Sequence, residues 1–230
     1  MFKNLDLPAL KANLNENGYA VLPQLFSEKI CDTLASAYDD SENFRSIINM
    51  KRYQFGSGEY KYFKYPLPAI IEEARHDIYP HLAHIANDWM VKLGIEKTFP
   101  NQLSELLRLC HENAQNRPTP LILKYETGDW NALHQDLYGD IYFPFQMVIF
   151  LTQPNVDYTG GEFIMLENRP RMQSKGIVLQ PNKGDAVVFT TNFRPTLGSR
   201  GYYRTSMRHG VSEVRSGKRI NLGIIFHDAK

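Results

Sequence analysis

The stretch RPTPLILKYETGD, residues 117–129, marks the point where the chain changes from a helical to a strand-like pattern. Two prolines end the helical pattern, an apolar run follows, and a Thr-Gly-Asp turn closes that run. Further short strand-like runs lie at 145–151, 162–166, 177–179, 186–189, 202–207 and 220–226. Turn residues separate these runs and no helical pattern intervenes. The sequence therefore predicts an antiparallel sandwich or barrel of the jelly-roll type, a double-stranded β-helix.

The first 116 residues are predicted to be mainly helical and to pack against that barrel, which makes the fold class α+β. Leucines recur at helical spacing over 5–14, and helical patterns return after Ser27 and over 69–94 and 100–114, while 19–22 forms a short strand. Residues 44–68 are aromatic and aperiodic, so we expect a loop or irregular strand there; whether it acts as a lid is left open. Residues 117–230 are the expected core, and both parts are expected to form one structural domain.

The composition excludes several classes of protein. The chain has 230 residues, a formal net charge of +1 and two cysteines, Cys31 and Cys110. These values exclude a histone-like or polyacidic protein, a disulfide framework and a four-cysteine zinc site. No apolar stretch approaches the roughly 18 residues that span a membrane, and the N-terminus is polar. We expect a cytoplasmic protein with no membrane and no stable protein partner.

The near-neutral total conceals an uneven distribution of charge. Residues 1–168 carry 14 Lys and Arg against 22 Asp and Glu, whereas residues 169–219 carry 11 against two. A basic block of this kind attracts carboxylates, phosphates or a nucleic-acid backbone. The alternative is that its arginines scatter over the fold and pair with the acidic first half.

The triplet His134-Gln135-Asp136 is the candidate metal motif. On an extended strand the first and third residues project to the same face, so His134 and Asp136 can converge on one ion. His209, on a much later strand-like run, is the best candidate for a third ligand. Two imidazoles and one carboxylate leave coordination positions open, as in non-haem Fe(II) oxygenases. Alone, the triplet also fits a buried hydrogen-bonded pair.

Two residues on neighbouring strand-like runs complete the candidate site. Arg219 follows His209 by ten residues and begins the run 220–226. Its planar guanidinium could hold a carboxylate through two parallel hydrogen bonds. Tyr125, on the run before His134, could donate its phenol to the same ligand. His227 lies at the end of the Arg219 run, where we expect a supporting or structural role.

The motifs of this half occur in an order that resembles the Fe(II)/2-oxoglutarate-dependent dioxygenase superfamily. They are Tyr125, His134-x-Asp136, GGEF at 160–163, PNKGDAVVF at 181–189, His209 and Arg219. The resemblance covers residues 117–230. It implies that His134, Asp136 and His209 bind Fe(II), that Arg219 anchors the far carboxylate of 2-oxoglutarate, and that O2 is the other co-substrate. A C–H bond would then be hydroxylated with release of succinate and CO2.

A narrower resemblance points to a prokaryotic 2-oxoglutarate oxygenase family described as acting on damaged, alkylated DNA. The matching strings are LHQDLYG at 133–139, FPFQ at 143–146, RPRMQS at 169–174, RHGVS at 208–212 and FHDA at 226–229. The strand RINL, 219–222, is similar to that of AlkB-type dealkylases, but their second arginine is missing here. The His209–Arg219 spacing instead resembles prolyl-hydroxylase-like members. Alkylated DNA or RNA, a protein side chain and a small molecule all stay open as substrates, as does a non-catalytic cupin-like module.

Two groups of residues are candidates for contacting a nucleic acid. Arginines interleaved with tyrosines suit phosphate contacts and base stacking; these are Arg169, Arg171, Arg194, Arg200 and Arg204. A base turned out of its strand needs an aromatic pocket, for which the candidates are Trp130, Tyr138, Tyr142 and Phe143. The alternatives are a solvated loop for the first group and core packing for the second.

Overall fold

Two antiparallel sheets face each other in the computed structural model, which describes residues 5–53, 55–136 and 139–230. The larger sheet has the order β1 (Tyr19–Leu22), β11 (Ala186–Thr190), β7 (Phe145–Phe150), β14 (Val214–Ile225), β5 (Leu121–Glu126), β4 (Glu59–Phe63) and β2 (Phe44–Asn49), with β8 (Tyr158–Gly160) paired to β14. The smaller has the order β10 (Lys175–Leu179), β9 (Phe163–Asn168), β13 (Gly201–Val211), β6 (Trp130–His134) and β3 (Gly56–Ser57), with β12 (Phe193–Gly198) paired to β13.

The helices are α1 (Leu7–Asn17), α2 (Glu28–Ser36), α3 (Ala69–Lys92) and α4 (Leu103–Glu112), with short 3-10 turns η1 (Ala37–Asp39), η2 (Ser41–Asn43) and η3 (Met50–Tyr53). The predicted helices are confirmed, and so is the cap of α2, where Ser27 Oγ accepts a hydrogen bond from the Ile30 amide. The helix α1 ends at Gly18, whose φ of 77° suits glycine. None of the helices in the described ranges is long and apolar enough to cross a membrane.

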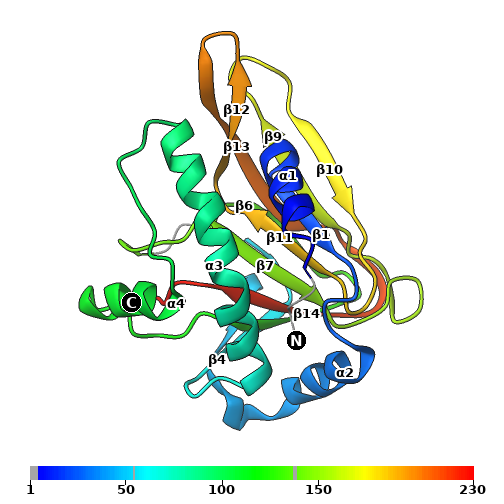
Figure 1. Ribbon diagram of the computed structural model, residues 1–230. Helices are drawn as coiled ribbons and strands as arrows, with labels where there is room; N and C mark the ends of the chain where they lie inside the picture. Colours follow the sequence, from blue (N-terminus) through cyan, green and yellow to red (C-terminus); the bar gives the residue numbers. More distant parts are fainter. Residues whose placement is uncertain (1–4, 54, 137–138) are drawn as a thin grey trace.

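Strand β7 shows how the sheet divides the core. All six of its side chains are buried, but they alternate between two faces. Phe145, Met147 and Ile149 belong to the core cluster shared with the helices, and the Phe145 ring lies 4.7 Å from that of Trp89 in α3. Val148 and Phe150 belong to a second cluster between the sheets. Figure 1 shows α1 and α3 crossing one face of the strands, which leaves the space between the two sheets for a site.

The part before residue 117 is less helical than expected. Its strands β1 and β4 pair with β11 and β5 of the larger sheet, and β3 pairs with β6 of the smaller one. Most of 44–63 is therefore regular sheet with one register shift between Phe44 and Ser46, where we expected a loop or irregular strand. The alternation is hidden in the sequence because both faces of β4 carry large side chains: Tyr60 and Tyr62 face the cavity between the sheets, while Phe63 packs in the helical core.

Strand β12 was not predicted, because Pro195 and Gly198 both disfavour strand interiors. It pairs with Gly201–Ser206 of β13, and the two strands form a hairpin that projects beyond the body of the sheet. Strand β13 is in turn longer than the predicted run 202–207, and it includes His209. The mixed fold of helices and antiparallel sheet is as predicted.

Candidate metal and co-substrate site

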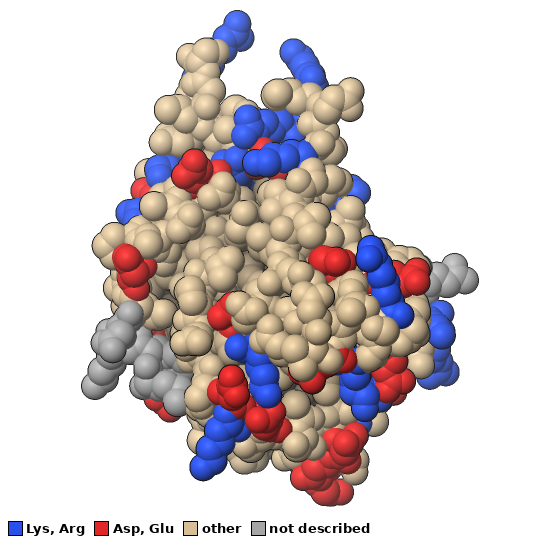
Figure 2. Space-filling view, turned by 90° about the vertical axis from the view of Figure 1, so that its right-hand side faces the viewer, with Lys and Arg blue, Asp and Glu red and all other residues tan. Residues whose placement is uncertain are grey.

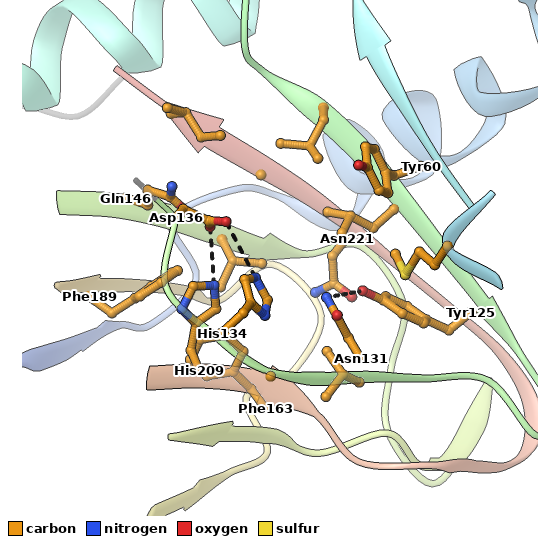
Figure 3. A pocket seen from close by; sticks show the side chains of 18 of the residues that line it. Tyr60, Tyr125, Asn131, His134, Asp136, Gln146, Phe163, Phe189, His209 and Asn221 are labelled. Atoms are coloured by element: carbon orange, nitrogen blue, oxygen red, sulfur yellow. Dashed lines mark hydrogen bonds and ion pairs between the residues drawn. The ribbon is translucent and has the colours of Figure 1, made fainter. Parts of the chain in front are cut away.

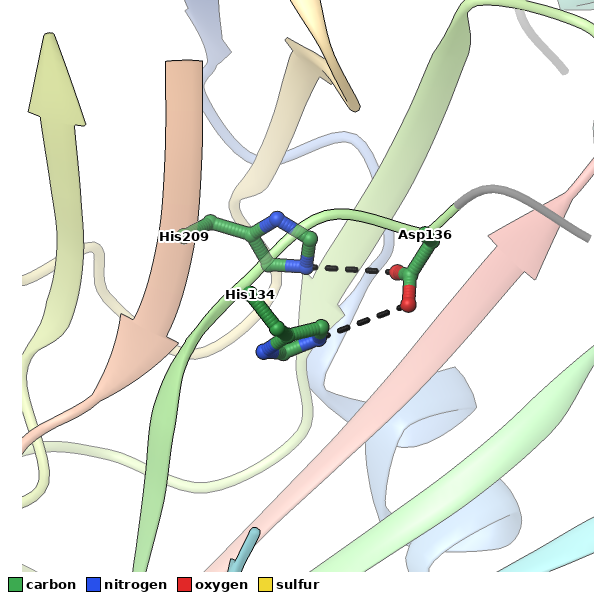
Figure 4. A group of neighbouring side chains, drawn as sticks. All are labelled: His134, Asp136 and His209. Carbon is green, nitrogen blue, oxygen red and sulfur yellow. Dashed lines mark ion pairs between the residues drawn. The ribbon is translucent and has the colours of Figure 1, made fainter. Parts of the chain in front are cut away.

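The structure brings the three predicted metal ligands together. Pairing of β6 with β13 places His134 directly opposite His209, and the chain turns after β6 so that Asp136 faces both rings. The distance from His134 Nε2 to Asp136 Oδ1 is 3.4 Å, and from His209 Nε2 to Asp136 Oδ2 3.3 Å (Figure 4). One ligand atom from each residue lies within 4.8 Å of the others, and no other such group occurs among the described residues. Asp136 thus reaches the site just beyond the end of the strand.

Backbone contacts favour one tautomer of His134. Its Nδ1 lies 2.7 Å from the carbonyl oxygen of Ala132, which can only accept a hydrogen bond. Nδ1 therefore carries a proton, so Nε2 is the atom that can exchange its hydrogen bond with Asp136 for a bond to a metal ion. His209 is buried, and its Nδ1 has no hydrogen-bond partner in the described part of the chain.

The pKa values at this group suit a cation between the three side chains. Burial by itself would raise the pKa of Asp136, but hydrogen bonds with His134 and His209 outweigh it and hold that pKa well below its usual range. Burial lowers the pKa of His209. Burial also acts to lower the pKa of His134, yet its hydrogen bond with Asp136 leaves the value raised. The carboxylate is therefore ionised and ready to bind a divalent metal.

Gln135 lies between His134 and Asp136 in the chain, and its side chain connects this segment to β13, the strand that carries His209. Its Nε2 donates to the carbonyl oxygens of Met207 at 2.8 Å and Asn192 at 2.9 Å. Met207 lies two residues before His209 on β13. The side chain thus links the turn that carries Asp136 to the strand that carries His209, which sets their separation.

A cavity of about 380 Å³ opens beside this group (Figure 3). Several polar side-chain atoms of its lining are buried and lack a hydrogen-bond partner among the described residues: Asn131 Oδ1, Gln146 Nε2, Asn221 Oδ1, and Nε and Nη2 of Arg219. Buried polar atoms are normally satisfied, so these atoms indicate a cavity that takes a polar ligand.

Arg219 lies on β14 at one end of this cavity. It is 2% exposed, and its guanidinium carbon lies 5.4 Å from the rings of both Tyr125 and Phe150. Burial lowers the pKa of Arg219, while the phenol oxygens of Tyr158 and Tyr125 act in the opposite direction. Gly161 makes room for it, because a Cβ there would meet Arg219 Cδ at 2.9 Å. A buried guanidinium with free N–H groups calls for an anionic partner.

Tyr125 lies opposite Arg219 in the register of β5 and β14. Burial raises its pKa to about 12, so the phenol stays protonated and able to donate. The Asn131 amide donates to the Tyr125 oxygen at 3.4 Å. The polar groups at this end of the cavity therefore suit a carboxylate held by Arg219 and a phenol O–H.

Comparison with known proteins places the chain in a family. A family model described as an oxygenase "catalysing oxidative methylation of damaged DNA" matches residues 58–229. The chain belongs to this oxygenase family. Proteins from two strains of Mycobacterium tuberculosis, CDC 1551 / Oshkosh and H37Rv, are each 51% identical over 167 residues, which is 73% of this chain and 72% of the relative.

Solved structures of low sequence identity share the fold of this oxygenase. A prolyl-4-hydroxylase of Pseudomonas putida has a TM-score of 0.59 at 14% identity, covering 97% of this chain and 99% of that one. A prolyl hydroxylase of Trichoplax adhaerens scores 0.55 at 13% identity, covering 94% and 86%. A 2OG-Fe(II) family oxidoreductase of Burkholderia pseudomallei scores 0.53 at 14% identity, covering 98% and 93%.

Family, fold and the His–Asp–His group together support the predicted use of Fe(II) and 2-oxoglutarate by this oxygenase. The residues fit both groups. Two imidazoles and one carboxylate suit Fe(II) and leave coordination positions for co-substrates. The unsatisfied N–H groups of Arg219 suit the second carboxylate of 2-oxoglutarate.

Other predicted site residues of the oxygenase lie elsewhere. Trp130 is 42% exposed on β6, and the Tyr142 ring contacts Lys97 and Phe99; neither lines the cavity. Phe143 packs in the helical core. Tyr138 lies outside the described residues.

The predicted arginines divide into two groups. Arg169 and Arg194 both bind Glu167, with closest N–O distances of 2.7 Å. These ion pairs match the predicted alternative, in which arginines of the basic block pair with acidic residues of the first half. Arg171 and Arg200 are exposed in the turns that follow β9 and β12.

Sequence reasoning missed the aromatic and amide residues that line the cavity. Tyr60, Tyr62, Gln146 and Asn221 all face it. The signal that could have found them is the two-residue period of their strands, since Asn221 is two residues from Arg219.

Proposed function

We propose that this oxygenase removes methyl groups from alkylated DNA by oxidation, with residues 117–230 forming a jelly-roll core within one structural domain. When bound, Fe(II) and 2-oxoglutarate together with O2 supply the oxidant for C–H hydroxylation, with succinate and CO2 as co-products. Hydroxylation of an N-methyl group gives an N-hydroxymethyl group, which splits into the N–H base and formaldehyde. Applied to damaged DNA, oxygenase chemistry therefore takes methyl groups away.

The observation that carries the proposal is the His–Asp–His group beside a cavity that ends at a buried arginine. In this scheme His134, Asp136 and His209 are the metal ligands and thus the catalytic residues. Arg219 and Tyr125 bind and orient the co-substrate. The apolar side chains of the cavity exclude water, which strengthens the charge-assisted hydrogen bonds inside it.

DNA as substrate is supported by the family description and by exposed arginines. Figure 2 shows Lys and Arg side chains gathered at the end of the molecule that carries two projecting loops. Arg204 and Arg208 are exposed on β13, and Arg200 is exposed in the turn before it. Arg204 and Arg208 project from the face of β13 opposite to His209, because side chains alternate along a strand. Arg200 lies about 30 Å from His209 along the strand, at about 3.4 Å per residue, and would contact a phosphate far from the reacting base.

The direct test incubates the protein with Fe(II), 2-oxoglutarate, O2 and single-stranded oligonucleotides that carry one N-methylated base. We expect formaldehyde and succinate in equal amounts, and the demethylated base by mass spectrometry. Asp136→Ala should abolish all three products. Succinate formation without any demethylated base, across a panel of methylated oligonucleotides, would contradict a DNA substrate.

The exposed arginines offer an independent test. Arg200→Ala should weaken binding of long oligonucleotides and reduce the salt dependence of their affinity, while binding of a trinucleotide stays the same. Equal losses for both lengths would contradict a phosphate contact far from the base. Fluorescence anisotropy at several salt concentrations measures this difference.

The fold shared with prolyl hydroxylases favours a second candidate, hydroxylation of a protein side chain or small molecule. This candidate predicts a stable alcohol as product, with no formaldehyde. A non-catalytic, cupin-like module would instead bind the metal and form no succinate under any condition. The same assay therefore separates all three.

A further inference from the structure

Gln146 lies in the cavity beside the metal group, and its amide has unused donor capacity. The side chain projects from β7 and is 5% exposed, yet Nε2 has no hydrogen-bond partner among the residues described. Gln146 and Asp136 both line this cavity, and the view in Figure 3 places them at one side of it and Tyr125 at the other. A buried, unsatisfied N–H that lines a cavity is suited to bind an acceptor on a ligand.

The sheet register shows that Gln146 is too far from Arg219 to serve 2-oxoglutarate. Gln146 lies opposite Ile225 on β14, and Arg219 is six residues earlier on that strand. Six residues of strand place about 20 Å between the Cα atoms of Arg219 and Ile225. Four C–C bonds of about 1.5 Å limit a five-carbon dicarboxylate to about 6 Å. With one carboxylate at Arg219, the co-substrate therefore leaves the Gln146 end of the cavity open.

The wall of the cavity at this end suits a flat, apolar group. Tyr62, Leu121 and Gly223 are paired across three neighbouring strands, and all three line the cavity. Gly223 adds no side chain, and a Cβ there would lie 2.8 Å from Leu121 Cδ2. The Tyr62 ring is held in place by Arg45, whose guanidinium stacks on it at 4.4 Å.

We propose that this end of the cavity is the substrate subsite, and that Gln146 Nε2 donates a hydrogen bond to a ring carbonyl beside the methylated nitrogen of an uncharged base. This inference rests on the proposed DNA substrate and names its class. Among the described lining residues Asp136 is the single carboxylate, and a bound metal would neutralise it. A cationic base such as 1-methyladenine has no carbonyl beside its methyl group and would present an amino group to the amide donor. In 3-methylthymine, carbonyls flank the methylated nitrogen on both sides.

The test compares oligonucleotides that carry 3-methylthymine or 1-methyladenine, using wild-type protein and Gln146→Met. Methionine keeps the length of the side chain and removes the donor. We expect wild type to prefer 3-methylthymine, and Gln146→Met to raise its KM for that base about 10-fold and to lose the preference. The KM for 2-oxoglutarate should stay the same, because the co-substrate binds at the Arg219 end of the cavity. The control variant Gln153→Met makes the same chemical change in a loop, where the amide binds Asn182, and should alter none of these values.

The outcomes distinguish this inference from the proposed function. If wild type demethylates DNA but Gln146→Met keeps both the KM and the base preference, the subsite is wrong and the function stands. If wild type prefers 1-methyladenine, the assignment of a carbonyl-bearing base is wrong. If wild type demethylates no base, the proposed function and the subsite fall together.

Discussion

Replacing Gln135 by methionine should weaken metal binding without touching a metal ligand. In the folded protein its Nε2 lies within hydrogen-bond distance of four oxygens: Met207 O at 2.8 Å, Asn192 O at 2.9 Å, Asn192 Oδ1 at 3.1 Å and Ser206 Oγ at 3.2 Å. An amide nitrogen has two hydrogens, so the two backbone carbonyls are its main partners.

The expected loss of stability follows from those partners. Two net hydrogen bonds contribute about 0.5–1.5 kcal/mol each, and a buried carbonyl left without a donor adds to the loss. Asn192 O also accepts from the Met207 amide, so it keeps one partner. We therefore expect Gln135→Met to lower the free energy of unfolding by about 2–3 kcal/mol. Because the turn carrying Asp136 is then no longer tied to the strand carrying His209, metal affinity should fall about 10- to 100-fold.

The assay pairs metal titration with urea unfolding, and Gln115→Met is the matched control. Like the partly buried Gln135, the buried Gln115 has an amide with several hydrogen bonds, here to the backbone of Ile141 and Asp228. Its variant should lose similar stability and keep the wild-type Co(II) affinity. The reasoning is refuted if Gln135→Met binds Co(II) as wild type does, or if Gln115→Met loses as much affinity.

Three further perturbations test other parts of the structure. Arg219→Met should raise the Kd for 2-oxoglutarate about 30-fold or more, because a buried carboxylate loses its charged partner; titration of the Mn(II)-loaded protein measures it, and an unchanged Kd would contradict the assignment. Burial lowers the pKa of His227 from 6.5 to about 4, so the unfolded chain binds more protons between these values and stability falls as pH drops through this window. Urea unfolding should show that His227 accounts for a loss of about 2 kcal/mol in the free energy of unfolding between pH 7 and pH 5. His227→Asn keeps an acceptor for the Phe143 amide and should remove this contribution. An equal pH-dependent loss in the variant would contradict the role of His227. Glu167→Gln should lower the free energy of unfolding by about 3–5 kcal/mol, since Arg194 is 5% exposed and loses its counter-charge; a change below 1 kcal/mol would show that the pair contributes little.

The sequence alone determined the elements that local patterns encode. Two-residue alternation and turn residues predicted most strands of the second half, and caps such as Ser27 predicted helix ends. The spacing of His134 and Asp136 predicted two ligands on one side of the chain. The resemblance supplied the iron and 2-oxoglutarate roles, which family and fold then supported.

Tertiary structure decided which distant residues share the cavity. Gln146, Tyr62 and Arg219 come from three strands, and only the register of β4, β5, β14 and β7 determines how far apart they lie. It also decided that Arg194 pairs with Glu167 instead of facing solvent. The physical reason is that hydrogen bonds between strands set the register, and a shift of one residue would turn every side chain to the opposite face. A sequence pattern shows which residues alternate; only the assembled sheets determine which of the two faces surrounds the metal.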